Sequence, residues 1–210
     1  MKLTYATGLG LLMALLVIFP LQASDFDRDL AEARTVFLQG VDGDKNAVRT
    51  AIRRFKSLSH KNPQEPVLLA YLGACMTLQG RDAGNNLDKR RLTEDGLGKI
   101  DKALSMQAER ADQGSAHHLD TLLVAANSYI HIPAFFNRHD KGRQLLQQIL
   151  DDSNFGAMAA GFKAATYLAA ALVAHGDGNE AAYRRYLDLT MTVDPNGRDG
   201  RFASSLRKEL

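Results

Sequence analysis

The chain has few of the residues that form covalent crosslinks, and it lacks the pattern of β-strands. Of its 210 residues one is cysteine, none is tryptophan and 7% are aromatic. The single cysteine, Cys75, excludes an internal disulfide, and its apolar neighbours favour a small core residue over a reactive thiol. Alternating runs of β-branched residues, which are typical of half-buried strands, do not occur. The sequence therefore predicts neither a disulfide scaffold nor a sheet.

An excess of charge of one sign is also missing. Without residues 1–23, whose one charged residue is Lys2, 25 lysines and arginines stand against 24 aspartates and glutamates. Such a balance disfavours nucleic acid or an anionic membrane surface as the main partner. We predict no nucleic-acid partner, and contact with a membrane only through an uncleaved N-terminal segment.

Motifs of catalysis and of cofactor binding are missing as well. The chain contains no HExxH, GxSxG, GxxxxGK or CxxC. Residues 42–46 begin like a calcium loop, but Ala47 stands where the loop requires glycine and Arg53 where it requires glutamate. The better interpretation is a helix start capped by Asp44. We predict no catalytic residue, no metal site and no cofactor.

The N-terminus, in contrast, carries a long apolar run. Residues 9–19 are apolar, Pro20 interrupts them, and a small residue, Ala23, follows. As a helix the run would cover about 16 Å, which is less than the hydrocarbon core of a membrane. This layout is typical of a secretory signal peptide, residues 1–23, with cleavage between Ala23 and Ser24.

The location of the protein follows from this segment. Cleavage predicts a periplasmic or secreted domain that begins at residue 24. The alternative is an inner-membrane anchor over the uncharged residues 5–23, with the domain outside the cytoplasm.

Helical periodicity fills the rest of the chain, so we predict an all-α fold. Clusters of Gly, Pro, Asn and Asp separate the periodic segments. Residues 80–90 are predicted as a long polar loop, and Gly80 and Gly176 as helix ends in a conformation that favours glycine. The predicted helices are 25–39, 44–60, 66–79, 91–107, 116–131, 134–151, 157–175, 179–193 and a short one near 200–208.

Two of these helices share a pattern, because residues 67–80 and 163–176 align at several positions. The matches are Tyr71 with Tyr167, Leu72 with Leu168, Ala74 with Ala170 and Gly80 with Gly176. Small residues there, such as Gly73, would let neighbouring helices approach closely. Similar helices joined by short connections are expected to form antiparallel pairs, here about four in a row.

At these residues the chain resembles the tetratricopeptide-repeat (TPR) family. The matching residues are Leu72-Gly73, Gly80, Ala103-Leu104, Leu168, Gly176-Asp177, Ala182, Tyr186 and Asp194-Pro195. The resemblance implies a right-handed α-hairpin solenoid of about four TPR-like helix pairs over residues 24–196, followed by a capping segment, 197–210. Gly40, Gly80, Pro133 and Gly176 lie 40, 53 and 43 residues apart, more than the family's period of about 34, so a regular superhelix is not implied.

Together with the predicted signal peptide, the resemblance implies a function, an exported scaffold or adaptor of the bacterial cell envelope that binds a protein or peptide. The partner would lie in a groove lined by the first helix of each pair. Tyr71 is equally compatible with a packing role, because tyrosine often buries its ring. The candidate groove residues are Tyr71, Thr77, Asp120, Asn127, His131, Lys163 and Thr166.

Two features leave other interpretations open. An all-α enzyme or small-ligand-binding protein would need a cleft that collects Asp120, His131 and His139. The adjacent Phe135 and Phe136 cannot both face one helical core stripe, so one packs on a neighbouring unit or is exposed at a binding surface.

Overall fold

The computed structural model describes residues 24–110 and 114–210, and within them all regular structure is helical. The all-α prediction is therefore confirmed for this part of the chain. The elements are α1 (Asp25–Val41), α2 (Lys45–Lys61), α3 (Pro66–Asp82), α4 (Asn86–Ala108), α5 (Ala116–His131), the 3-10 turn η1 (Ala134–Phe136), α6 (His139–Asp151), the 3-10 turn η2 (Phe155–Ala157), α7 (Ala160–Gly176), α8 (Glu180–Val193) and α9 (Arg198–Lys208).

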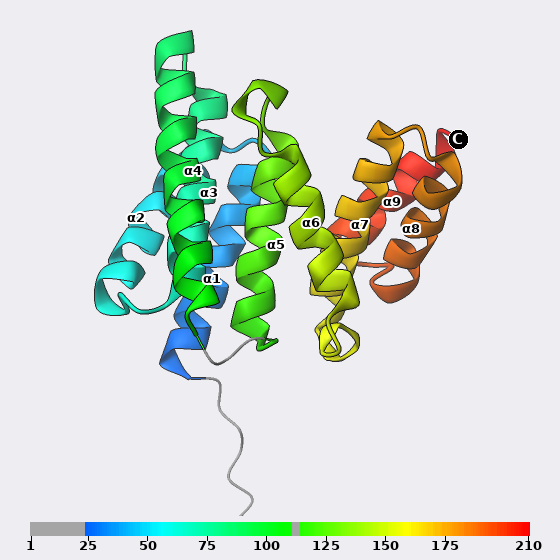
Figure 1. Ribbon diagram of the computed structural model, residues 1–210, viewed down its shortest axis with the longest axis horizontal. Coiled ribbons are helices and arrows are strands. Elements are labelled where there is room, and N and C mark those ends of the chain that lie inside the picture. Colours follow the sequence, from blue (N-terminus) through cyan, green and yellow to red (C-terminus); the bar gives the residue numbers. More distant parts are fainter. Residues whose placement is uncertain (1–23, 111–113) are drawn as a thin grey trace, which may run out of the picture.

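Consecutive helices pack against each other, α1 on α2, α3 on α4, α5 on α6 and α7 on α8. The first helices of these pairs also contact one another in series, from α1 through α3, α5 and α7 to α9. Figure 1 shows the resulting elongated molecule, with α1 to α5 at one end and α7 to α9 at the other. The odd-numbered helices thus form one row, and the even-numbered helices flank it.

Polar side chains just before several helices explain where these helices begin. Asp44, for example, accepts hydrogen bonds from the backbone amides of Asn46 at 2.8 Å and Ala47 at 3.1 Å, which confirms the capping role predicted for it. The same role is played by Ser24, Asn85, Ser115 and Asn179.

The predicted loop over residues 80–90 is wrong. α3 continues to Asp82, and α4 begins at Asn86, so the connection is only three residues long. Gly80 lies inside α3, where a Cβ atom would come within 2.5 Å of the Thr93 hydroxyl oxygen. Its role is therefore to admit α4 rather than to end α3. The polar residues of this stretch lie on exposed helix surface, and the sequence pattern does not distinguish that from a loop.

Two other helix ends differ from the prediction. Gly176 is the last residue of α7, but the left-handed conformation falls at Gly178, where φ is +70°. The predicted helix over 134–151 is divided by Asn137, which is left-handed with φ 54° and ψ 49°. Asparagine adopts this conformation more readily than most residues, so a 3-10 turn precedes the helix that begins at His139.

α3 and α4 make the most extensive helix contact, and it depends on two glycines. A Cβ on Gly73 would lie 2.5 Å from the carbonyl oxygen of Gly96, and a Cβ on Gly96 would lie 2.6 Å from that of Gly73. The two backbones therefore touch, which confirms the close approach predicted at Gly73. Cys75, two residues further, is buried in the core, where desolvation raises the pKa of its thiol to about 12; the prediction of an unreactive core residue is confirmed.

Candidate interaction surface

Three residues of the predicted groove lie on one side of α5. Asp120, Asn127 and His131 lie seven and four residues apart, a spacing that places them on one side of the helix. Asn127 is half-buried and His131 is exposed, with its Nδ1 atom 2.8 Å from the Asn127 carbonyl oxygen. Asp120, at the other end of the same side, is buried.

α1 covers Asp120. The Tyr71 hydroxyl donates a hydrogen bond to Asp120 Oδ1 at 3.0 Å, and the Arg34 guanidinium donates one to Oδ2. The guanidinium carbon of Arg34 also lies 5.5 Å from the centre of the Tyr71 ring. This buried polar network, Arg34–Tyr71–Asp120, joins α1, α3 and α5 with one residue from each.

Tyr71 is a packing residue in this structure. Its ring stacks on Phe55 with centroids 4.8 Å apart and contacts Phe37 edge-on at 5.2 Å. Only 6% of the residue is exposed. The groove positions assigned to Tyr71 and Asp120 are thus corrected: both side chains lie inside, because α1 crosses over them.

Burial dominates the ionisation of this network. Desolvation raises the pKa of the Tyr71 phenol well above its ordinary value, and the Asp120 charge raises it further. Burial likewise raises the pKa of Asp120, against the positive charge of Arg34, which lowers it. Each charged group of the pair therefore depends on the other, because neither is well hydrated.

The other predicted groove residues are Thr77, Lys163 and Thr166, and each donates a hydrogen bond to a backbone carbonyl. Thr77 is half-buried and Thr166 is fully buried, and each hydroxyl donates to a carbonyl of its own helix. The Lys163 ammonium donates to the carbonyl oxygen of Gly156 at 3.1 Å. Lys163 and Thr166 are thus engaged within the last pair and its connection. Thr77 packs against α4, since a Cβ atom on Gly96 would lie 2.9 Å from the Thr77 Cγ2 atom. The groove position assigned to Thr77 is therefore corrected.

The three residues of the enzyme alternative do not converge. Asp120 and His131 are eleven residues apart on α5, about 16 Å along the helix axis. His139 Nε2 lies 2.6 Å from the carbonyl oxygen of Ile132, in the turn after α5. Within residues 24–110 and 114–210, no group of three or more His, Cys, Asp or Glu side chains is arranged to hold a metal ion.

A second polar cluster, centred on Asp101 of α4, was not predicted. Its carboxylate accepts hydrogen bonds from the Tyr129 hydroxyl at 2.7 Å, Arg138 at 3.0 Å and Lys141 at 2.7 Å. Partial burial raises the pKa of Asp101, but the hydrogen bonds and charges of these donors outweigh it and hold the pKa below its ordinary value. One donor comes from α5, one is the residue that precedes α6, and one comes from α6. Nothing in the local pattern around Asp101 indicates this convergence.

The adjacent phenylalanines divide between core and surface. Phe136 packs with Leu97 and Tyr129, whereas Phe135 on the same 3-10 turn is 67% exposed. Their ring centroids lie 4.3 Å apart. One aromatic therefore packs on a neighbouring helix and the other is open to solvent.

The two ends of the helix row also meet. The guanidinium of Arg198, the first residue of α9, donates hydrogen bonds of 2.9 Å and 2.6 Å to a carboxylate oxygen of Asp42, in the turn after α1. These residues are 156 positions apart in the chain. The row must therefore curve, because only a curved row brings its last helix back to its first turn.

No family model, curated protein or solved structure matches this chain. The evidence for a function is thus the arrangement of helices and the side chains they expose. Among the described residues, no helix is both long and apolar enough to cross a membrane. The predicted leader, 1–23, which includes Ala23 of the predicted cleavage site, lies outside the described residues, and Ser24 caps α1.

Proposed function

We propose that this protein is an exported scaffold of the bacterial cell envelope that binds a protein or peptide in the curved row of its odd-numbered helices. The observation that carries the proposal is the serial contact of these helices, with the two ends of the row joined by Arg198 and Asp42. A curved row presents one face from every helix pair, which is how solenoid proteins hold extended partners. A right-handed TPR-like superhelix would have this geometry.

The proposed contact residues are Asn127 and His131 on α5. The Asn127 side-chain amide makes no hydrogen bond within the described part of the chain, so its donor and acceptor are both available. Such groups suit the backbone of an extended peptide, which offers both donors and acceptors. We therefore expect recognition through polar contacts on this face.

Photo-crosslinking in cells tests the proposal. A photoreactive residue at position 127 should capture a defined partner in the envelope, whereas one at the exposed position 185 on α8 should not. Asn127→Ala with His131→Ala should weaken capture by the purified protein at least about tenfold, with an unchanged circular dichroism spectrum. Equal capture at both positions, or no effect of the double substitution, would contradict the proposed contact face.

Export is tested separately by fractionation and N-terminal sequencing. Cleavage predicts a soluble envelope protein whose first residue is Ser24. Retention in the membrane with residues 5–23 present would instead support the anchored alternative.

A further inference from the structure

α2 differs from the rest of the chain in its charge. It contains no aspartate or glutamate. Its seventeen residues include six lysines and arginines, namely Lys45, Arg49, Arg53, Arg54, Lys56 and Lys61. The near balance of charge over the whole chain therefore does not hold for α2, in which every charged residue is a lysine or an arginine.

Four of these residues form a continuous stripe. Lys45, Arg49, Arg53 and Lys56 follow at intervals of four, four and three, which places them on one side of α2. All four are exposed, while the helix buries its opposite side against the core. We call these four residues the basic stripe; it is about 16 Å long at ~1.5 Å per residue.

No carboxylate of the described residues forms an ion pair with the stripe. Arg49 donates to the Asn46 amide oxygen, and Arg53 donates to the Thr50 hydroxyl at 3.0 Å, so both partners are neutral. Within the described residues, Lys45 and Lys56 have no ion pair. The helix's ion pair, Arg54 with Glu32 on α1, lies off the stripe.

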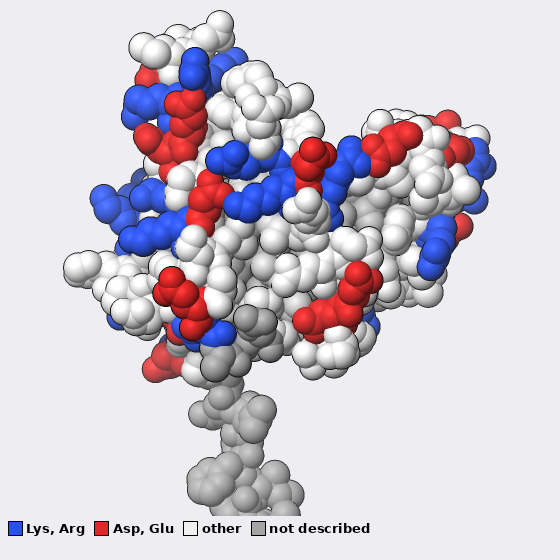
Figure 2. Space-filling model, in the orientation of Figure 1, with Lys and Arg blue, Asp and Glu red and all other residues white. Residues whose placement is uncertain are grey.

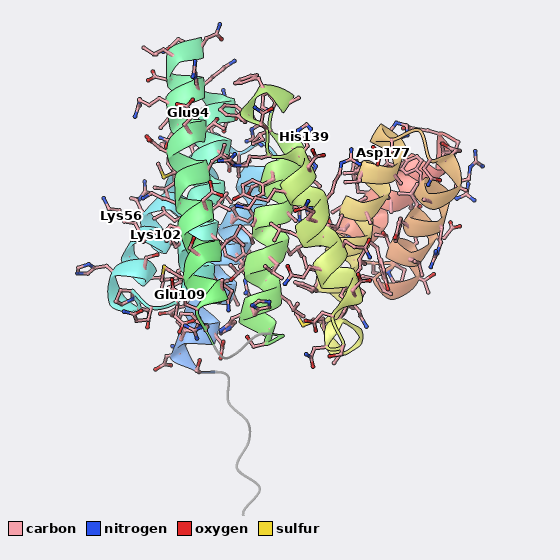
Figure 3. All side chains as sticks on the ribbon, viewed as in Figure 1. Lys56, Glu94, Lys102, Glu109, His139 and Asp177 are labelled. Atoms are coloured by element: carbon pink, nitrogen blue, oxygen red, sulfur yellow. The ribbon has the colours of Figure 1, made fainter. Side chains whose placement is uncertain are left out.

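α4 does not extend the basic surface, because its charges are mixed: Arg90 pairs with Glu94, and Arg91 with Asp88. Lys45 and Arg49 of α2 line one open hollow together with Arg91 and two carboxylates, Asp82 and Asp88. Figure 2 shows lysines and arginines at this edge of the molecule with aspartates and glutamates among them, and Figure 3 labels Lys56 of α2 and the exposed Lys102 of α4 there. The excess of positive charge therefore belongs to α2.

We propose that the basic stripe binds the surface of an anionic phospholipid membrane. Arg49, Arg53 and Lys56 follow one another along the exposed side of α2, so a broad anionic surface can reach them together. Lys45 and Arg49 also border the hollow that contains Asp82 and Asp88, whose carboxylates disfavour an acidic peptide there. The stripe contains no aromatic side chain on which the bases of a single-stranded nucleic acid could stack. It also contains no apolar side chain that could insert, so the attraction is electrostatic and weakens with salt.

This surface is separate from the proposed peptide face. The stripe lies on α2, whereas Asn127 and His131 lie on α5 in the row of odd-numbered helices. A membrane against α2 would leave that row free. The protein could therefore hold a partner at the membrane surface without inserting a helix of its described part.

Vesicle sedimentation tests the proposal. The full chain is expressed, and the protein is purified as the cell processes it, then mixed with phosphatidylglycerol–phosphatidylcholine vesicles or with pure phosphatidylcholine vesicles. We expect binding to the anionic vesicles only. Arg49→Gln, Arg53→Gln and Lys56→Gln together should weaken it on the order of 100-fold, because each cation near an anionic surface contributes about fivefold.

A matched variant removes the same charge elsewhere. Arg185→Gln, Arg201→Gln and Lys208→Gln alter exposed cations of α8 and α9, and we expect less than about a threefold change. Circular dichroism shows whether both variants are folded. Equal losses in the two variants, equal binding to both vesicle types, or binding to an acidic peptide or DNA without binding to anionic vesicles would each overturn the proposal.

Discussion

The first five helices and the last three are joined in different ways. In α1 to α5, the buried network of Arg34, Tyr71 and Asp120 connects three helices through directional hydrogen bonds. The backbones of α3 and α4 also touch at Gly73 and Gly96. Both kinds of contact require one arrangement, because a small shift would break a charged hydrogen bond or separate the two backbones.

The junction between α7 and the helices before it relies on weaker and less directional contacts. Its core combines small residues, including Ala126 on α5 and Ala169 and Ala170 on α7, with larger ones such as Leu146 on α6. At the surface, Arg143 of α6 pairs with Asp177 in the turn after α7, where both groups are hydrated. Such contacts tolerate small displacements, because neither requires a single geometry.

Because of this difference, we expect the last three helices to change position more easily than the first five. The α5 face belongs to the first five helices, whose contacts require one arrangement, so its side chains keep their positions. The last three helices can shift against it, within the limit set by the contact between Arg198 and Asp42. A scaffold built in this way combines a fixed recognition face with an end that adapts to its partner.

The largest expected effect comes from breaking the buried network. Asp120→Ala should lower the free energy of unfolding by about 3 kcal/mol, because it leaves the partly buried Arg34 without its counter-charge. This is the low end for such pairs, since 32% of the Arg34 side chain is exposed. Urea denaturation measures the loss. Asp177→Ala, the matched change at the exposed junction, should leave the midpoint almost unchanged, and equal losses would contradict the comparison.

The second test separates close packing from helix propensity in α3 and α4. Gly73→Ala should destabilise the protein by roughly 2 kcal/mol, because the new Cβ meets a backbone oxygen that cannot move aside. Gly98→Ala, on the exposed side of α4 with open space around it, should stabilise by up to about 1 kcal/mol. Thermal or urea unfolding gives both signs, and a neutral Gly73→Ala would show that the two backbones can separate.

A smaller effect is expected at Asp101, and it depends on pH. Because the folded-state pKa lies below the ordinary value of about 4, its ion pairs stabilise the protein above that pH. This contribution is lost as the pH falls through the folded-state pKa. Asp101→Asn should therefore cost about 1 kcal/mol at pH 7, since the group is one-third exposed. The stabilities of the two proteins should converge as the pH falls below the ordinary value; a difference that persists in acid would mean that the loss is not electrostatic.

The smallest effect on stability is expected where the two ends meet. Arg198→Gln removes an exposed ion pair and should cost less than about 1 kcal/mol. It should, however, broaden the distance between spin labels placed in the turn after α1 and on α9. High salt should produce the same broadening in the unaltered protein. An unchanged distance distribution in both cases would show that other contacts hold the ends together.

The local features of this fold, such as helices and their caps, could be predicted from the sequence. Helical spacing, the caps at Asp44 and at the other helix starts, and the small residue at Gly73 were sufficient for an all-α array of consecutive helices. These features follow from interactions within about one turn of helix, so a single chain segment contains the information. The spacing of Asp120, Asn127 and His131 likewise placed the three on one side of α5.

Which of these side chains are buried, in contrast, depends on how the helices pack against one another. Asp120 and Tyr71 became internal because α1 crosses them, and Gly80 became a packing site because Thr93 approaches it. In both cases the outcome depends on a contact between different helices, and the pattern of either segment alone does not contain it. The basic stripe of α2, in contrast, is a local pattern in the sequence, and the charge balance of the whole chain obscured it.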